Sequence, residues 1–236
     1  MSEIWDPHGS LQRTLWIGGA QWSGKTTVAQ AIAEGHGLTV YHYDYHDARG
    51  HQDRRIARRV ALGEPVGNPT PDHVWVEQSP EKMASETLAG FPVRFEWALD
   101  DLRALFTGRP AIAEGWGLRP ELVAPLLDSL RRMVVLVPTE DFRRHQLRAL
   151  PRAGTLSAPV TDQARAQANR VARDRLIAED AVRNARRLGI RVIEIDGTLD
   201  ATAVAAEVAD HFAPYLGAAT AARAHEKTAG HTSGTP

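Results

Sequence analysis

The chain has 236 residues, and its 28 lysine and arginine side chains nearly balance its 29 aspartates and glutamates. This length suits one domain, or two small ones, with a proper hydrophobic core. The hydrophobic share of 43% and the charged share of 24% exclude collagen-like, coiled-coil and wholly disordered chains. A formal charge of −1 disfavours a dedicated nucleic-acid binder.

The sequence shows no sign of export or membrane insertion. No apolar run approaches the ~20 residues that a helix needs to cross a bilayer. Met1–His8 lacks the basic and then apolar pattern of a signal peptide. The absence of cysteine excludes disulfides, a cysteine nucleophile and zinc sites built on cysteine. We therefore expect a cytoplasmic protein with no membrane or nucleic-acid partner, and a homodimer stays open.

Short apolar runs predict five buried strands, and the segments between them predict helices. The expected strands are 13–18, 38–43, 110–113, 132–137 and 190–195. The expected helices are 25–34, a basic stretch at 54–59, 79–107 with a break near Gly90 and Pro92, 120–130, 141–150, 161–187 and 200–213. Residues 217–236 are small and polar, and we expect them to form a flexible tail.

This alternation of strands and helices predicts an α/β fold. We expect a three-layer sandwich over residues 13–213, formed by a single domain. A five-stranded parallel sheet would lie in the middle, with helices on both faces. The connection 48–107 between the second and third strands is far longer than a crossover needs, so it is expected to build a structure of its own.

The segment between the first strand and the first helix contains the most specific motif of the chain. Gly19-Ala20-Gln21-Trp22-Ser23-Gly24-Lys25-Thr26 matches the phosphate-binding (Walker A) pattern G-x-x-x-x-G-K-[ST] without a mismatch. Its glycines allow a tight turn that points backbone N–H groups at phosphate oxygens, and the helix N-terminus adds partial positive charge. Lys25 is expected to reach the β- and γ-phosphates, and the Thr26 hydroxyl to ligate Mg²⁺. Trp22 is expected to cover the loop rather than to stack on a substrate.

Together with Gly18 before it and Thr27 after it, this loop resembles that of the P-loop kinases of the nucleoside and nucleotide kinase-like group. Small-molecule phosphotransferases related to chloramphenicol phosphotransferase are plausible relatives. The order of the motifs extends the resemblance over 13–213. It implies that ATP and Mg²⁺ bind at the C-terminal edge of the strands. It also implies that the insertion 48–107 holds the acceptor and that an arginine-bearing lid, at 151–187, closes over the phosphates.

Two acids follow the second predicted strand, at the edge where open parallel sheets bind ligands. A kinase needs a carboxylate that orients the acceptor hydroxyl and accepts its proton. Asp44 best matches the acid that does this in the resembled kinases. Asp47 could instead hold Mg²⁺ or the acceptor, or act as the base in place of Asp44. The neighbouring histidines match no zinc spacing well and are expected to be solvated or hydrogen-bonded; they are His42, His46 and His51.

Further acceptor-site candidates follow the third strand and lie in the insertion. Glu114 ends the strand where P-loop proteins often place an acid near Mg²⁺, so we expect it to contact either the metal or the acceptor. Trp116 is expected to line the pocket. Five arginines of the insertion could bind an anionic acceptor, with a solvated helix face as the alternative; they are Arg54, Arg55, Arg58, Arg59 and Arg94. Of these, Arg94 is favoured as a pocket residue.

The lid and the last turn supply the remaining candidates. Arg170 and Arg173 are three residues apart and share a helix face, and arginines at this place in the chain stabilise the transferring phosphoryl group in the resembled kinases. Pairing with acids on the same helix is the alternative. Arg144, His145 and Arg148 are weaker lid candidates. Asp196 and Gly197 form a turn that resembles the one wrapping the nucleotide base in this group.

The leading hypothesis is an ATP-dependent kinase that phosphorylates a hydroxyl or phosphate group of a small molecule. In this hypothesis Lys25, Asp44, Arg170 and Arg173 are catalytic. The acceptor could be a nucleoside, a nucleotide or a hydroxylated antibiotic. The alternative is an ATP-binding resistance or regulatory protein that sequesters a ligand without fast transfer. The chain is short and lacks the acidic pair of ATPase motors, which disfavours a motor.

Overall fold

The computed structural model describes residues 4–67, 69–105, 107–150, 156 and 158–229. Its sheet has five strands in the order β2-β3-β1-β4-β5, so β1 is central. All neighbouring strands pair in parallel. Their bounds are β1 Leu15–Gly19, β2 Thr39–His42, β3 Ala111–Glu114, β4 Met133–Pro138 and β5 Arg191–Ile195. The predicted five-stranded parallel sheet is confirmed.

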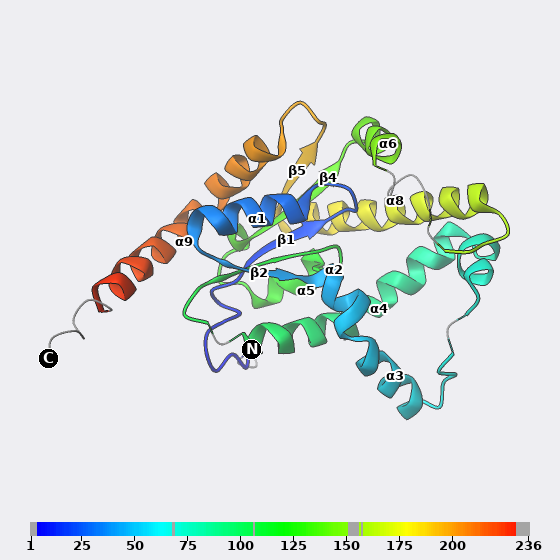
Figure 1. Ribbon diagram of the computed structural model, residues 1–236, viewed down its shortest axis with the longest axis horizontal. Coiled ribbons are helices and arrows are strands. Elements are labelled where there is room, and N and C mark those ends of the chain that lie inside the picture. Colours follow the sequence, from blue (N-terminus) through cyan, green and yellow to red (C-terminus); the bar gives the residue numbers. More distant parts are fainter. Residues whose placement is uncertain (1–3, 68, 106, 151–155, 157, 230–236) are drawn as a thin grey trace, which may run out of the picture.

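Helices cover both faces of this sheet (Figure 1). The main helices are α1 Lys25–His36, α3 Gln52–Ala61, α4 Pro80–Ala104, α6 Glu140–Ala149, α8 Gln163–Leu188 and α9 Ala201–Ala229. Shorter turns are α2 Tyr43–Tyr45, η1 His46–Gly50, η2 His73–Glu77, α5 Pro120–Val123, η3 Ala124–Leu126 and η4 Leu130–Arg132. One core cluster lies between the sheet and α1 with α9, and a second lies between the sheet and α4, α5 and α8. The chain therefore has the expected three-layer P-loop architecture.

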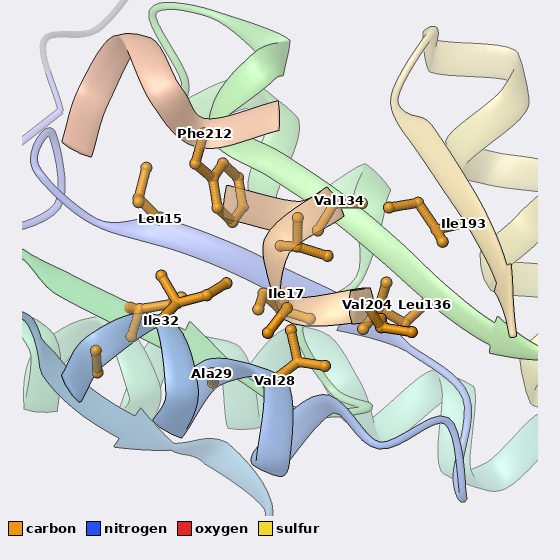
Figure 2. Close-up of a cluster of buried hydrophobic side chains, with 14 of the residues drawn as sticks. Leu15, Ile17, Val28, Ala29, Ile32, Val134, Leu136, Ile193, Val204 and Phe212 are labelled. Atoms are coloured by element: carbon orange, nitrogen blue, oxygen red, sulfur yellow. The ribbon is translucent and has the colours of Figure 1, made fainter. Parts of the chain in front are cut away.

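The central strand shows why these layers form. Leu15 and Ile17 pack toward α1 and α9, where Figure 2 places them with Phe212. Trp16 points to the opposite face and packs near Phe95 of α4, with 6.1 Å between the ring centroids. A parallel strand buried on both faces is apolar throughout. Because burial of one such side chain contributes about 1.5–3 kcal/mol, β1 gives the following loop a rigid base.

Helix α4 continues through the point where the sequence predicted a break. It spans Pro80–Ala104 with Pro92 inside. A proline in a helix interior removes one N–H donor and crowds the carbonyls of the preceding turn. The side chain of Arg94 braces the turn around Pro92, because its Nε donates to the Gly90 carbonyl at 3.1 Å and its Nη2 donates to the Thr87 carbonyl at 2.9 Å. The predicted interruption near Gly90 and Pro92 is therefore wrong.

Two further helix boundaries differ from the predictions. The expected helix 120–130 is only the single turn α5 followed by the 3₁₀ turn η3, which contains a proline at 125. The last helix, expected to end at 213, continues as α9 to Ala229 despite Pro214. Leu216 is buried and Tyr215 packs against the same core cluster, so tertiary contacts extend the helix beyond the proline. The flexibility expected for 217–236 stays a prediction, and 230–236 lie outside the described residues.

The insertion between β2 and β3 consists of α2, η1, α3, η2 and α4. Figure 1 shows α3 projecting away from the sheet at the lower right. This helix buries none of its side chains, whereas α4 buries seven against the rest of the fold. Within the insertion, α4 is therefore packed against the rest of the fold, whereas α3 is only loosely packed.

Candidate active site

The phosphate loop lies between a strand and a helix, as predicted. β1 ends at Gly19 and α1 begins at Lys25. Gly19 has a φ of 123°, and a Cβ at this position would lie 2.0 Å from the Leu136 carbonyl oxygen. Gly24 has a φ of 78° with open space around it. The Ala20 N–H donates to the same Leu136 oxygen at 2.9 Å, so the loop is fixed against the neighbouring strand β4. Only glycine tolerates these two positions without strain.

Side chains of the loop close it from within. Ser23 is buried, and its hydroxyl donates to the Ala20 carbonyl at 3.0 Å. Lys25 is also buried, and its Nζ donates to that carbonyl at 2.6 Å. Gln21 is half-buried. Trp22 adopts a φ of 64°, which is rare for a residue with a large side chain. The surrounding loop therefore holds the backbone at Trp22 in a sparsely populated conformation.

Glu114 connects the loop to the neighbouring strands. It lies beside Ile17 of β1 and His42 of β2 in the sheet register. Its Oε1 accepts a hydrogen bond from the Thr26 hydroxyl at 3.1 Å and from His42 Nδ1 at 2.9 Å. Its Oε2 is buried and has no hydrogen-bond partner within the described part of the chain. A buried carboxylate oxygen without a partner beside a threonine hydroxyl fits the oxygen ligands that Mg²⁺ prefers.

Asp44 lies at the same edge of the sheet. It belongs to α2, directly after β2, and its Oδ1 accepts a hydrogen bond from the Trp116 N–H at 3.0 Å. The pKa of Asp44 is raised to about 6, mainly by burial; the Lys25 ammonium opposes this shift and the Glu114 carboxylate adds to it. A carboxyl group with a pKa just below neutrality is ionised at physiological pH and can accept a proton. Asp44 therefore has the position and the chemistry of a general base.

Asp47 faces the insertion instead. Its side chain is buried, and it forms ion pairs with Arg94 at 2.9 Å and with Arg55 at 3.2 Å. Neither Thr26 nor Glu114 hydrogen-bonds to it. The structure thus brings Asp47 and Arg94 together, as two of the predicted substrate-binding residues. It gives Asp47 the role of holding two guanidinium groups, which sequence analysis did not foresee.

Aromatic rings connect this cluster to Asp44. The Arg94 guanidinium lies 4.6 Å from the centroid of Phe91, and Phe91 meets Trp116 edge to face at 5.3 Å. Arg173 of α8 lies 5.5 Å from Trp116 and 4.8 Å from Trp75. Trp116 therefore touches both sides of the site, with its backbone on Asp44 and its ring among the arginines.

The two predicted lid arginines reach different parts of the site. Arg170 lies 6.0 Å from the Trp22 ring, beside the phosphate loop. Arg173 faces the insertion, and its Nε donates to the buried Asp174 at 2.9 Å. Pairing with an acid on the same helix, the alternative weighed from the sequence, thus holds for Arg173. Most of the connection before α8 cannot be compared with the prediction, because 151–155 and 157 lie outside the described residues.

A pocket of about 460 Å³ opens on the other side of the phosphate loop. Its lining includes Trp22, Thr27, Phe142, Gln146 and Gly197. Asp196 stabilises the turn, because it accepts hydrogen bonds from the N–H and the hydroxyl of Thr198. The predicted base-binding turn therefore borders a hollow next to the loop, and Trp22 forms part of its wall.

Sequence analysis did not identify Arg143 of α6 as a buried arginine. Its side chain is buried, with Glu140 3.6 Å from its Nε, and burial lowers its pKa. The neighbouring Arg144, which the sequence suggested, is exposed and pairs with Asp141. Which of the two arginines points inward depends on how α6 is rotated about its axis relative to α8. No motif could have indicated it.

Two of the three histidines, His42 and His51, are hydrogen-bonded, one of the two states that the sequence analysis expected. His42 donates to Glu114, and His51 Nε2 donates to Asp101 at 2.6 Å. Tyr41 donates to the same Asp101 oxygen at 2.9 Å, and His46 lies 3.6 Å from it. His46, His51 and Asp101 are close enough to hold a cation. Because Tyr41 and His51 already satisfy this oxygen, a hydrogen-bond network accounts for the cluster.

Within the described residues, no helix is both long and apolar enough to span a membrane. No protein-family model matches the chain, and no curated protein does. Among solved structures, the shikimate kinase from Acinetobacter baumannii in complex with shikimate is similar, with 18% identity, a TM-score of 0.44, and coverage of 85% of this chain and 92% of that one.

Two further solved structures are similar. For the shikimate kinase from Aquifex aeolicus, the identity is 16%, the TM-score is 0.39, and the coverage is 83% of this chain and 92% of that one. For a gluconokinase from Sinorhizobium meliloti, the identity is 14%, the TM-score is 0.39, and the coverage is 88% and 94%. Similarity of this degree does not transfer an acceptor to this chain, whose own site has to indicate it.

Proposed function

We propose that this chain is an ATP-dependent phosphotransferase that moves the γ-phosphoryl group of ATP to a hydroxyl group of a small molecule. The observation that supports it most is the meeting of three groups at one sheet edge. These are the phosphate loop with Lys25, the buried Glu114 carboxylate and the Asp44 carboxylate. A nucleotide-binding protein without transfer chemistry has no need of a base at this position.

In the proposed reaction Asp44 orients the acceptor hydroxyl and accepts its proton as the oxygen attacks the γ-phosphorus. The bond from the γ-phosphorus to the bridging oxygen breaks, and ADP leaves with that oxygen. Lys25 and Arg170 lie on the nucleotide side, where their positive charge stabilises the negative charge spread over the transferring group. Asp44 must be ionised to act, which its pKa of about 6 permits at neutral pH.

Mg²⁺ is the metal that the donor set fits. Thr26 and Glu114 would hold it, since a hydroxyl and a carboxylate oxygen without a hydrogen-bond partner lie side by side there. When bound, the ion supplies positive charge for the β- and γ-phosphates. His42 holds the Glu114 carboxylate from the other side, because its Nδ1 lies 2.9 Å from Oε1.

Mass spectrometry of small-molecule pools incubated with the protein, ATP and Mg²⁺ tests this function. The pool combines nucleosides, nucleoside monophosphates, sugars, hydroxy acids and hydroxylated antibiotics, including chloramphenicol. We expect one acceptor to gain a phosphoryl group with the wild type and not with Lys25→Ala. ATP binding without any phosphorylated product would contradict the proposal and favour a protein that sequesters its ligand.

A further inference from the structure

A second pocket, of about 470 Å³, lies between α3, η2 and α4. Arg173 of α8 contributes to it. Its charged lining is strongly unequal, with five arginines against two glutamates: Arg55, Arg58, Arg59, Arg94 and Arg173 against Glu64 and Glu86. For a chain with a formal charge of −1, this is a local concentration of positive charge. Such a concentration calls for an anionic ligand.

Trp116 links this pocket to Asp44. The Trp116 N–H donates to Asp44, while the ring of Trp116 lies 5.5 Å from the Arg173 guanidinium that lines the pocket. Asp47, three residues after Asp44, holds Arg94 of the opposite wall. Trp116 and Asp47 therefore each link the neighbourhood of Asp44 to an arginine that lines the pocket.

The guanidinium groups next to Asp44 are held in place before any ligand arrives. Arg94 is fixed by the carbonyls of Thr87 and Gly90 and by Asp47. Asp47 is shared with Arg55, so one buried carboxylate neutralises only one of two arginines. Three donors of Arg94 are engaged in these bonds, and a guanidinium has five. The remaining N–H groups are free to bind a planar anion in the bidentate manner that arginine favours.

Helix α3 carries two arginines, Arg58 and Arg59, that form no ion pair with another described residue. The Arg58 side chain makes no hydrogen bond or ion pair with another described residue, and the Arg59 side chain donates only a long 3.4 Å bond to the Gly67 carbonyl. Arg54, one turn before Arg58, lies outside the pocket and faces the Asp101 carboxylate at 3.6 Å. The same helix therefore provides one arginine with a structural partner and two that face the hollow.

We propose that the acceptor is an organic anion. Its hydroxyl group lies at Asp44, and its carboxylate or phosphate monoester lies among Arg58, Arg59, Arg94 and Arg173. This inference rests on the proposed kinase function and narrows its substrate class. A neutral acceptor such as a free nucleoside or chloramphenicol would leave Arg58 and Arg59 without a counter-charge. The other pocket arginines have acidic partners, since Arg55 and Arg94 share Asp47 and Arg173 pairs with Asp174. The apolar wall formed by Trp97 and Val93 accommodates the carbon skeleton between the two ends.

Matched pairs of probes test the proposal. Gluconate is compared with glucose, shikimate with its methyl ester, and uridine and adenosine monophosphates with their nucleosides. The binding of each is measured by calorimetry with ADP and Mg²⁺ present, and phosphoryl transfer is measured with ATP. We expect one anion of the panel to bind at least tenfold more tightly than its neutral partner, since a charge-assisted hydrogen bond is worth about that much. Comparison of the carboxylate probes with the phosphate monoester probes shows which anionic group the pocket binds.

Two single variants on α3 provide the control. Arg58→Gln and Arg54→Gln remove the same charge one helical turn apart. We expect Arg58→Gln to weaken binding of the preferred anion roughly tenfold and Arg54→Gln to leave it unchanged. Arg58→Gln/Arg59→Gln should weaken it further, and because both side chains lie on a helix with no buried residues, folding should be retained.

The outcomes separate this inference from the kinase function. Transfer to a neutral probe that equals or exceeds transfer to every anion overturns the inference and leaves the kinase function intact. Anion binding that depends on Arg58, without transfer to any probe, supports the pocket and contradicts the kinase function. If no anion binds better than its neutral partner, or if Arg54→Gln and Arg58→Gln act alike, the inference is wrong.

Discussion

The nucleotide side and the acceptor side of this site are held by different kinds of interaction. The phosphate loop is fixed by backbone hydrogen bonds to β4 and by a strand whose five residues are all buried. The acceptor side depends on α3, which buries no side chain and is tied to the fold by ion pairs such as Arg55 with Asp47. Packing and backbone hydrogen bonds therefore hold the nucleotide side, whereas ion pairs hold the acceptor side.

This difference indicates how each half responds to substitution. The backbone of the phosphate loop tolerates no added volume, because atoms at packing distance leave no space. An ion-pair cluster is sensitive to charge instead, since removal of one charge leaves its partners uncompensated. Substitutions chosen on the two sides should therefore separate the KM for ATP, the KM for the acceptor, and stability.

The largest effect is expected for Lys25→Ala. The variant removes the buried ammonium group that faces the phosphates, and the loss in kcat should be on the order of 10³-fold. Steady-state kinetics with the acceptor that the mass-spectrometric screen identifies measures it. Lys82→Ala is the matched control, because Lys82 is exposed on α4 and only 3.9 Å from Glu86. Turnover near the wild-type level in Lys25→Ala would remove the phosphate loop from the mechanism.

Asp44→Asn should lower kcat by about 10²–10³-fold, the range for loss of a general base. The KM for ATP should stay close to that of the wild type, because asparagine can still accept the Trp116 N–H. In the wild type, kcat should rise with pH through about 6, where Asp44 ionises, and then level off. In Asp44→Asn, kcat should not rise with pH in this range. Equal losses in kcat and in ATP affinity would instead assign Asp44 to metal binding or folding.

Stability gives Asp44 a second, independent signature. Its pKa is raised from 3.8 to about 6 in the fold, so the ionised carboxylate opposes folding. This cost is absent below pH 3.8, grows between the two values and is complete above about 6. Asp44→Asn should therefore keep or raise Tm by roughly 2–4 °C at pH 7.5, with the difference shrinking toward pH 4. A large fall in Tm would indicate a structural role.

Asp47→Asn should have the opposite profile. It leaves Arg55 and Arg94 close together without their shared carboxylate. Breaking a fully buried ion pair costs about 3–5 kcal/mol, and because both arginines are partly exposed we expect about 2 kcal/mol here. Thermal unfolding should show Tm lowered by roughly 4–8 °C, and the acceptor KM should rise while the KM for ATP does not. An unchanged Tm would show that Asp47 does not hold the two arginines.

The features that could be predicted from the sequence are those encoded locally. Eight consecutive residues specify the phosphate loop, and Glu114 and Asp44 were found because each follows a recognisable strand. Asp47 shows the limit, since its partners Arg55 and Arg94 lie 8 and 47 residues away. Charge alone cannot tell which of five nearby arginines faces an aspartate, because that depends on how α3 and α4 are rotated.

Tertiary contacts also overrode local helix signals. Pro92 and Pro214 both indicate a helix end, and both lie inside helices, where Arg94 satisfies nearby carbonyls and Leu216 is buried. Arg143 was missed because its burial depends on the contact between α6 and α8. For Arg143 the neighbouring charged residues other than Glu140 belong to α8, which is distant in the sequence, so a pattern within α6 contains no trace of them.

The smallest effect, and the sharpest comparison between the two halves, is expected for two glycines with similar backbones. Gly197 has a φ of 86°, and a Cβ there would lie 2.7 Å from Phe142 Cδ2 in the wall of the base pocket. Gly63 has a φ of 67°, with nothing within 4 Å. Alanine at either position should cost about 1 kcal/mol of backbone strain.

Only Gly197→Ala should also displace Phe142, because the new Cβ would overlap the aromatic ring at 2.7 Å. We expect it to raise the KM for ATP several-fold and to leave the acceptor KM unchanged. Gly63→Ala should lower Tm by a similar amount and leave the KM for ATP unchanged. Because the backbone penalty is matched, any difference in ATP affinity measures the packing of the base pocket alone. Equal KM values for ATP in the two variants would show that the hollow beside Gly197 does not bind the nucleotide.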